Sequence, residues 1–246
     1  MKTRYILFDV DGTLTPSGGE ILPEMVTCLQ QLKTTTNCVL GLVGGGTYVK
    51  IQSQMGDALD LFDLVFAECG SVLYEKGNLV YSRNMMEVVN KEKLDRIIEL
   101  AKDKIFAMPI VRTPDTPRNQ IDVRQGLVYV SLPGMLASPI QRNHVKQVDA
   151  KLNLRRNLIK QLKQLDEEDE LDIVIGGEVG IAIFPRGFDK SQVLKHFDMG
   201  TSEIYFFGDR TQSGENDYPL FSHPRVVGFS VKDWEDTCEK IRQNFV

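Results

Sequence analysis

The chain has 246 residues, 42% of them hydrophobic, which is enough apolar material for one large or two modest globular domains. Its formal net charge is -5 with acids and bases interspersed, which excludes the basic stripes of nucleic-acid and membrane binders and favours small-molecule partners. Its four cysteines are scattered and no signal peptide pattern precedes the first apolar run, so we expect a cytoplasmic protein with reduced thiols.

Two aspartates stand at the end of the first apolar run. Asp9 and Asp11 follow the strand pattern that begins at Ile6, and Gly12 comes directly after them. Because side chains alternate along a strand, both carboxylates are expected on one side, and the glycine allows a sharp turn that leaves backbone N–H groups open to an anion. This combination suits a phosphate and a divalent cation. The alternatives are a solvated strand end or a calcium loop, but Leu14 occupies a position where a calcium loop needs an oxygen ligand.

A glycine turn follows the second expected strand. The apolar run over residues 38–43 ends in Gly44, Gly45 and Gly46, and a helix pattern over residues 48–59 follows. Strand, glycine turn and helix is the order of many phosphate-binding loops, because N–H groups at a helix N-terminus face the anion. A glycine triplet alone fits a simple tight turn equally well. Together with the aspartate motif, it predicts that the backbone at Gly45 binds substrate.

The alternation of strands and helices stops in the middle of the chain. Hairpin and helix patterns there predict a separate antiparallel sheet backed by helices. Its strands are expected at residues 121–124, 127–131, 171–175 and 180–185, and helices at 86–105 and 149–165. Before it, residues 64–68 form a third short apolar run, and residues 72–81 form a hairpin that turns at Gly77-Asn78 and fits a small β flap.

The βα order returns near the end of the chain. A helix opens at Lys190, a strand over residues 203–209 ends on Asp209, and a final strand and helix follow. The predicted fold class is therefore α/β, with a Rossmann-like parallel-sheet core and an inserted α+β cap domain. The expected boundaries are 1–81 and 187–246 for the core and 82–186 for the cap.

The expected strand ends carry a complete set of groups for phosphoryl transfer. Ligands of an open parallel sheet bind beyond the carboxyl ends of its strands, where Asp9, Asp11, Gly45 and Asp209 are expected. Asp9 can attack phosphorus to give an aspartyl phosphate, and Asp11 can move the proton of the leaving oxygen. Mg²⁺ held by Asp9, Asp209 and the Asp11 carbonyl would offset the repulsion between anions. Lys190 would add a fixed cation, although a solvated lysine at a helix start is the alternative.

Four further side chains are candidates for supporting roles. Asn216 and Asp217 are expected to hydrogen-bond the metal ligands, and a helix N-cap is the alternative role for Asp209. Arg124 and Arg142, in the expected cap, are candidates to anchor a substrate phosphate, because a guanidinium can hold phosphate through two bonds. The alternative for each is a solvated surface arginine. All three histidines are expected to be structural.

Several segments resemble the eukaryotic-type phosphomannomutases of the haloacid dehalogenase-like superfamily. The resemblance extends over nearly the whole chain and implies an α/β core with a mobile cap, Mg²⁺, a hexose 1,6-bisphosphate activator and a homodimer formed through the caps. It implies interconversion of mannose 6-phosphate and mannose 1-phosphate for GDP-mannose synthesis. It also implies Asp9 as nucleophile, Asp11 as acid/base, and Arg124 and Arg142 as phosphate ligands. The matching segments are residues 8–15, 43–45, 187–190, 205–209 and 214–217.

The sequence departs from that family mainly at substrate contacts. The family usually has an arginine where this chain has Gly18 or Met135, a serine at Gly180, and an aspartate at Ala182. It also has an aspartate linked to a second ion at His223. We therefore expect weakened sugar binding. A Mg²⁺-dependent sugar-phosphate phosphatase on the same scaffold stays an alternative, as does a catalytically weak paralogue, although the complete set of acidic and basic groups argues against the latter.

Overall fold

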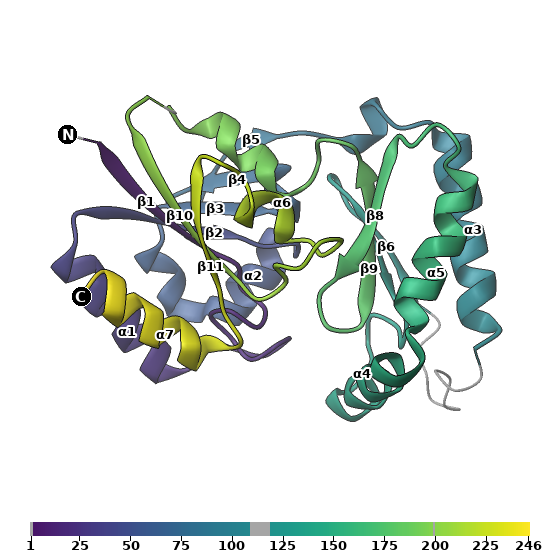
Figure 1. Cartoon of the computed structure of the whole chain (residues 1–246), viewed down its shortest axis with the longest axis horizontal. Coiled ribbons are helices and arrows are strands. Elements are labelled where there is room, and N and C mark those ends of the chain that lie inside the picture. Colours follow the sequence, from purple (N-terminus) through teal and green to yellow (C-terminus); the bar gives the residue numbers. More distant parts are fainter. Residues whose placement is uncertain (1, 109–118, 199) are drawn as a thin grey trace. The chain divides into compact units, whose positions relative to one another are not determined.

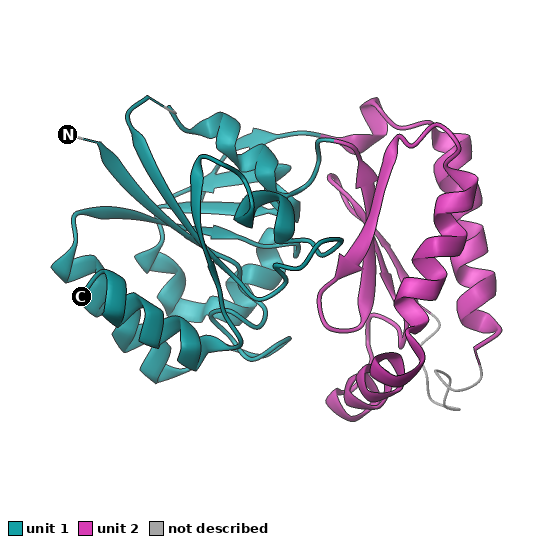
Figure 2. Cartoon of the chain, viewed as in Figure 1, with its two compact units in different colours: residues 1–83, 187–246 teal, residues 84–186 magenta. Residues whose placement is uncertain are grey.

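The computed structural model describes residues 2–108, 119–198 and 200–246, and the chain forms two compact units (Figures 1 and 2). Unit 1 combines Met1–Arg83 with Gly187–Val246, and unit 2 is Asn84–Arg186. Unit 2 is therefore an insertion in the chain of unit 1. That the segments 1–81, 82–186 and 187–246 act as a core and a movable cap stays a prediction.

Unit 1 is built on a seven-stranded sheet with the order β11-β10-β1-β2-β3-β4-β5. Its first five strands in that order run parallel, and β4 and β5 are antiparallel additions at one edge. Chain order reverses at β1, which lies between β2 and β10, and such a reversal opens a crevice at the carboxyl ends of the strands. The strands are β1 Thr3–Phe8, β2 Cys38–Val43, β3 Leu64–Ala67, β4 Val72–Glu75, β5 Asn78–Ser82, β10 Ser202–Gly208 and β11 Val226–Ser230.

Helices cover both faces of this sheet (Figure 1). On one face lie α1 (Pro23–Thr35), α2 (Tyr48–Met55) and α7 (Trp234–Asn244), which bury apolar side chains at helical spacing against alternate residues of β1 and β2. On the other face, the 3₁₀ helix η6 (Lys190–His196) and the short α6 (Tyr218–Phe221) pack on the intervening residues of the same strands. The result is the three-layer arrangement expected when a parallel sheet must be buried on both sides.

Unit 2 contains a four-stranded antiparallel sheet with the order β6-β7-β9-β8. Figure 1 shows α3 and α5 on one face of this sheet. None of the helices in the described part of the chain is both long and apolar enough to cross a membrane. The elements are α3 Lys91–Phe106, β6 Ile121–Val123, β7 Val128–Ser131, α4 Pro139–Leu152, α5 Leu154–Leu162, β8 Leu171–Gly176 and β9 Gly180–Pro185.

The predicted fold class is confirmed, but several local predictions are wrong. The helix expected over 48–59 ends at Met55, and a 3₁₀ helix over Gly56–Leu61 follows it. The helix expected over 149–165 is two helices, because Asn153 has left-handed φ 52° and ends α4. The hairpin of β4 and β5 turns at Lys76-Gly77, one residue early, and it extends the sheet of unit 1 as its edge. The helix expected from residue 86 begins at Lys91, because the Asn90 side chain caps it. The helix expected at Lys190 is of the 3₁₀ type.

The junction between α4 and α5 yields a stability test. Asn153 ends α4 with its N–H donated to the Asp149 carbonyl, and only glycine and, less easily, asparagine adopt its backbone conformation without strain. We expect Asn153→Ala to lower the free energy of unfolding by about 1 kcal/mol, and Asn153→Gly to leave it unchanged or raise it. Urea unfolding followed by circular dichroism measures both. Equal effects of the two substitutions would contradict a role for the backbone conformation.

Candidate active site

Asp9 and Asp209 directly follow two neighbouring parallel strands of unit 1. The register of β1 and β10 pairs Phe8 with Phe207, and the Asp9 N–H donates to the Phe207 carbonyl at 2.9 Å. Both acids therefore lie at the same edge of the sheet. Gly12 approaches closely, since a Cβ there would stand 2.7 Å from Asp209 Oδ2, and its φ of +83° also favours glycine. Gly12 thus lets the turn after β1 pack directly against the Asp209 carboxylate.

The turn after β1 uses the N–H groups of residues 12–15 within itself, so these four groups are not open to an anion as we expected from the sequence. The N–H groups of Thr13, Leu14 and Thr15 all approach the Val10 carbonyl, and the Gly12 N–H donates to the Thr15 carbonyl. The reason is that a turn this tight satisfies its own backbone groups. The strand itself ends before Asp9, so side-chain alternation does not place Asp9 and Asp11 on one side.

Lys190 is the buried cation of the site. Its side chain is fully buried, and Nζ lies 2.5 Å from Asp9 Oδ1 and 2.5 Å from Asp217 Oδ1. Burial disfavours the ammonium charge, but the charges of Asp217 and Asp9 outweigh it and raise the pKa of Lys190. From the sequence we expected Asp217 only to hydrogen-bond the metal ligands. Instead, Asp217 pairs with Lys190 and accepts the Arg210 N–H through its other oxygen at 3.0 Å.

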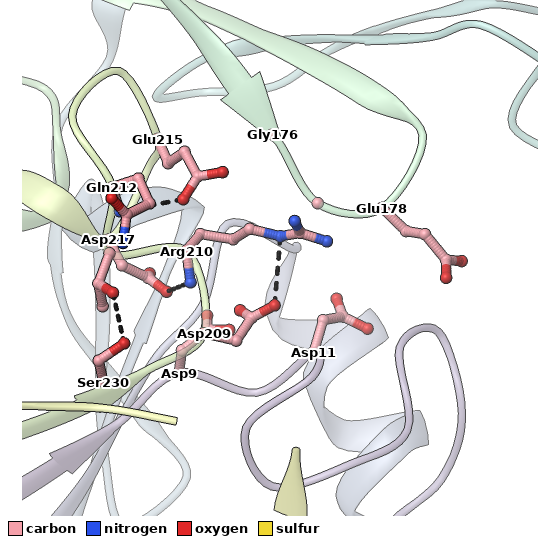
Figure 3. A network of polar contacts seen from close by, with 12 residues as sticks. Asp9, Asp11, Gly176, Glu178, Asp209, Arg210, Gln212, Glu215, Asp217 and Ser230 are labelled. Atoms are coloured by element: carbon pink, nitrogen blue, oxygen red, sulfur yellow. Dashed lines mark hydrogen bonds and ion pairs between the residues drawn. The ribbon is translucent and has the colours of Figure 1, made fainter. Parts of the chain in front are cut away.

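Three carboxylates gather around this lysine. Asp9, Asp209 and Asp217 each bring an oxygen within 4.8 Å of the others, and Figure 3 shows them with Arg210 beside Asp209. Burial and the charge of Asp217 raise the pKa of Asp9 to about 7, although the charge of Lys190 acts in the opposite direction. Burial and the charges of Asp9 and Asp217 raise the pKa of Asp209 to about 8. The cluster therefore carries more negative charge than its neighbouring cations offset.

The donor set fits a small divalent cation. Among the described residues, Asp209 Oδ1 is buried with no hydrogen-bond partner, and the same holds for Asn216 Oδ1. Carboxylate and amide oxygens are the ligands of hard cations, and a doubly charged ion would balance the acidic cluster. Asp217 is less available, because both of its oxygens already accept hydrogen bonds. The Asp11 side chain does not belong to this group, and the metal ligand expected from Asp11 is its backbone carbonyl.

Asp11 is held on the far side of the turn by contacts that the sequence analysis missed. Its carboxylate accepts from Lys50 Nζ at 2.6 Å, from Gln54 Nε2 at 2.8 Å and from the Gly18 N–H at 2.7 Å. Burial opposes the negative charge, but the Lys50 charge and these hydrogen bonds outweigh it and lower the pKa of Asp11. The helical spacing of Lys50 and Gln54 on α2 was the available signal, since residues four apart share a helix face. The contact with Lys50 therefore favours the ionised form of Asp11.

The glycine turn after β2 is fixed by the turn after β3. The Cys69 N–H donates to the Gly44 carbonyl at 2.9 Å, and the Glu68 N–H donates to the Gly46 carbonyl at 2.9 Å. The one atom that a Cβ at Gly45 would meet is Cys69 Sγ, at 3.7 Å. Burial raises the pKa of the Cys69 thiol to about 12, so this thiol is neutral. Gly45 thus lies in a fixed backbone turn at the carboxyl edge of the sheet.

The two candidate arginines belong to unit 2, each with an acidic partner. Arg124 Nε donates to Asp122 Oδ2 at 2.7 Å, just past the end of β6. Arg142 lies in α4 with Nη2 3.7 Å from Glu178 Oε2. Their proposed contact with a substrate phosphate stays a prediction.

The family model of eukaryotic phosphomannomutases matches residues 25–246. This chain belongs to that family. Among curated phosphomannomutases, the chain is 34% identical to the one from Dendrobium officinale over 100% of this chain and 96% of that protein. It is 34% identical to human phosphomannomutase 1 over 99% of this chain and 93% of that protein. It is 36% identical to the Galdieria sulphuraria phosphomannomutase over 97% and 93% of the respective chains.

Solved structures with low sequence identity support the fold of this family member. A Plasmodium falciparum IMP-nucleotidase aligns with a TM-score of 0.65 at 14% identity, over 98% of this chain and 68% of that chain. A protein related to trehalose-6-phosphate phosphatase aligns with a TM-score of 0.58 at 15% identity, over 97% of this chain and 96% of that chain. At such identities the likeness shows a shared architecture of core and insertion, and no more.

The buried ion pairs of Lys190 with Asp9 and Asp217 yield a stability test. Lys190→Met leaves the Asp9 and Asp217 carboxylates buried without their cation, so we expect the free energy of unfolding at pH 7 to fall by about 3 to 5 kcal/mol. The loss should shrink at pH 5, because protonation then removes the unpaired charge. Urea unfolding followed by the fluorescence of Trp234, the sole tryptophan, reports on unit 1.

Lys195→Met is the matched control, because Lys195 is an exposed lysine of the same helix. Its loss should cost less than about 1 kcal/mol. Similar effects of the two substitutions would contradict the role given to the Lys190 ion pairs.

Proposed function

We propose that this protein is a phosphomannomutase that interconverts mannose 6-phosphate and mannose 1-phosphate through an aspartyl phosphate and a hexose 1,6-bisphosphate. The observation that carries the proposal is the buried Asp9 carboxylate, ion-paired with Lys190 at 2.5 Å and grouped with Asp209 and Asp217 at the carboxyl edge of a parallel sheet. Whole-chain identity of 34% to curated phosphomannomutases supports the same reaction.

Asp9 is the proposed nucleophile. A lone pair of its carboxylate forms a bond to phosphorus, and the bond between phosphorus and the sugar oxygen breaks. Lys190 adds positive charge next to Asp9 and favours its ionised form, because the lysine charge lowers the pKa of Asp9 and so opposes part of the larger effect of burial. Mg²⁺, bound by Asp9, Asp209 and the Asp11 carbonyl, would supply the remaining positive charge that the acidic cluster and the phosphate dianion require.

Asp11 is the proposed acid and base. When the phosphoryl group moves to Asp9, the leaving sugar oxygen gains a proton from Asp11, and in the next step Asp11 removes the proton of the attacking hydroxyl. The ion pair with Lys50 favours the charged form of Asp11. Asp11 must therefore separate from Lys50 when substrate binds, so that it can take up and release a proton. Lys50 thereby also keeps Asp11 from acting on water when no sugar is bound.

Substrate binding needs contacts for the phosphate that does not react. Arg124 and Arg142 are the proposed ligands of that phosphate, and the backbone at Gly45 is a proposed contact of the reacting one. Absent arginines at Gly18 and Met135 lead us to expect a raised KM for mannose phosphates. We further propose a homodimer in the cytoplasm that supplies mannose 1-phosphate for GDP-mannose synthesis.

The distribution of products tests the proposed function. Purified protein with Mg²⁺ is given mannose 1-phosphate, with and without a catalytic amount of hexose 1,6-bisphosphate. We expect mannose 6-phosphate to form well ahead of free phosphate, and the bisphosphate to stimulate it, because the phosphorylated enzyme must meet a monophosphate. Release of phosphate without isomer would overturn the mutase proposal and support a sugar-phosphate phosphatase.

Asp9→Asn removes the nucleophile, so turnover should fall by a factor on the order of 10³ or more in the same assay. No acid-stable label should transfer from ³²P-labelled bisphosphate to this variant. Appreciable turnover by Asp9→Asn, or full activity of the wild type in EDTA, would contradict the aspartyl-phosphate mechanism.

Asp11→Asn tests the proton-transfer role. Because both half-reactions need the proton of Asp11, we expect formation and breakdown of the phosphoenzyme each to slow by about 10²- to 10⁴-fold. Rapid-quench measurements with labelled bisphosphate separate the two steps. A defect in one step alone, or none, would remove Asp11 from this role.

A further inference from the structure

An aromatic ring of unit 2 fills the space above a glycine. Tyr129 in β7 pairs with Ala182 of β9, so that Gly180 is its diagonal neighbour on the adjacent strand. A Cβ at Gly180 would stand 2.3 Å from both Cζ and Oη of Tyr129, far inside contact distance. The φ angle of Gly180 is not in the left-handed region, so the ring, and not the backbone conformation, is what excludes a side chain there.

The same ring supports the Arg124 guanidinium. Arg124 Cζ lies 5.1 Å from the centroid of the Tyr129 ring, within the range of a cation–π contact. Asp122, directly opposite Tyr129 in the ladder of β6 and β7, accepts from Arg124 Nε at 2.7 Å. The carboxylate fixes one edge of the guanidinium and the ring supports it, so its orientation is set before any ligand arrives.

The position of the ring is fixed in turn by the hairpin of β8 and β9. Tyr129 Oη donates to the Gly176 carbonyl at 3.3 Å. Arg155, a buried residue of α5, donates through Nη1 to the Gly177 carbonyl at 3.0 Å, and its Nε donates to Asp149 Oδ2 at 2.7 Å. The support of Arg124 therefore extends through Tyr129 to a hairpin that a buried arginine holds in place.

Residues of β8 and β9 beside the ring are small. Gly176 accepts from Tyr129 Oη, Gly180 lies against the ring, and Ala182 pairs with Tyr129 in the ladder, and none of the three has a side-chain donor or acceptor. Arg124 therefore contributes to binding at this end of the substrate together with Arg142, the other proposed phosphate ligand. An arginine that is ordered in advance loses less side-chain entropy on binding than a free one.

We propose that Tyr129 is the positioning residue for Arg124, and that Gly180 is required because the Tyr129 ring occupies the space of any side chain at that position. This proposal rests on the proposed function only in that Arg124 binds a phosphate of the substrate. Tyr129 is expected to affect substrate affinity. It is not expected to affect the chemical step at Asp9, which depends on residues of unit 1.

Removing the ring should weaken binding and spare the chemical step. We expect Tyr129→Leu to raise KM for mannose 1-phosphate about tenfold with kcat changed less than about twofold. Tyr129→Phe keeps the ring and loses only the bond to Gly176, so it should restore KM to within about twofold of the wild type. An unchanged KM for Tyr129→Leu would overturn the proposal, and so would an equal rise for Tyr129→Phe.

A second pair of variants tests the role of Gly180. Gly180→Ser displaces the ring, so it should raise KM about as much as Tyr129→Leu. In the background of Tyr129→Ala the serine meets no ring, so adding Gly180→Ser should cause no further loss, and the two effects should be strongly non-additive. Additive effects would overturn the proposal that Gly180 is required because of the Tyr129 ring.

Two controls separate this proposal from a folding defect and from failure of the proposed function. Phe106→Leu removes an exposed aromatic ring elsewhere in unit 2 and should leave KM unchanged. Calorimetric titration of each variant in an Asp9→Asn background with mannose 1-phosphate measures affinity without turnover. If the wild type proves to be a phosphatase, these affinities still test the proposal, because they do not depend on the reaction catalysed. Lowered unfolding midpoints with unchanged affinities would show that Tyr129 serves stability alone and would overturn the proposal.

Discussion

The organisation of unit 1 depends on one fully buried ammonium group. Lys190 Nζ lies 2.5 Å from carboxylate oxygens of both Asp9 and Asp217, so a segment that returns from the insertion is tied to the first strand and to the loop after β10. Removing charges from water is costly unless each is paired, and a pair that loses one partner becomes a strong liability. Lys190 therefore joins the two chain segments of unit 1 and sets the charge of the group that we propose as nucleophile.

The two aspartates of the first motif differ in their electrostatic surroundings. Asp9 lies in a buried acidic cluster that raises its pKa to about 7, whereas Lys50, Gln54 and a backbone N–H lower the pKa of Asp11. Residues two apart in sequence thus have opposite pKa shifts. In a site with one nucleophilic carboxylate and one acid, the acid is usually the group with the raised pKa, so the two shifts here run opposite to the proposed roles. The proposal therefore requires that bound ligands lower the pKa of Asp9 through added positive charge and raise that of Asp11 through release from Lys50.

Three glycines, two at this site and one in unit 2, leave space that a neighbouring side chain occupies. A Cβ at Gly12 would meet the Asp209 carboxylate at 2.7 Å, one at Gly208 would meet Asp217 Oδ2 at 2.6 Å, and one at Gly180 would meet the Tyr129 ring at 2.3 Å. In each case the glycine is explained by a partner outside its own strand or turn. For Gly180, the loss of a polar side chain relative to the family is accompanied by an aromatic ring that supports Arg124.

The sequence alone determined the fold class, because hydrophobic periodicity is local and the order of strands and helices restricts the topology to a parallel sheet with an insertion. It also placed Asp9, Asp209 and Gly45 at strand ends, since acids and glycines directly after apolar runs stand at the edge of such a sheet. Only the tertiary structure decided that Asp217 pairs with Lys190, that Lys50 holds Asp11, and that Tyr129 lies over Gly180. Each of these contacts joins residues of separate elements, and both its distance and its effect on charge depend on packing, which no spacing along the chain encodes.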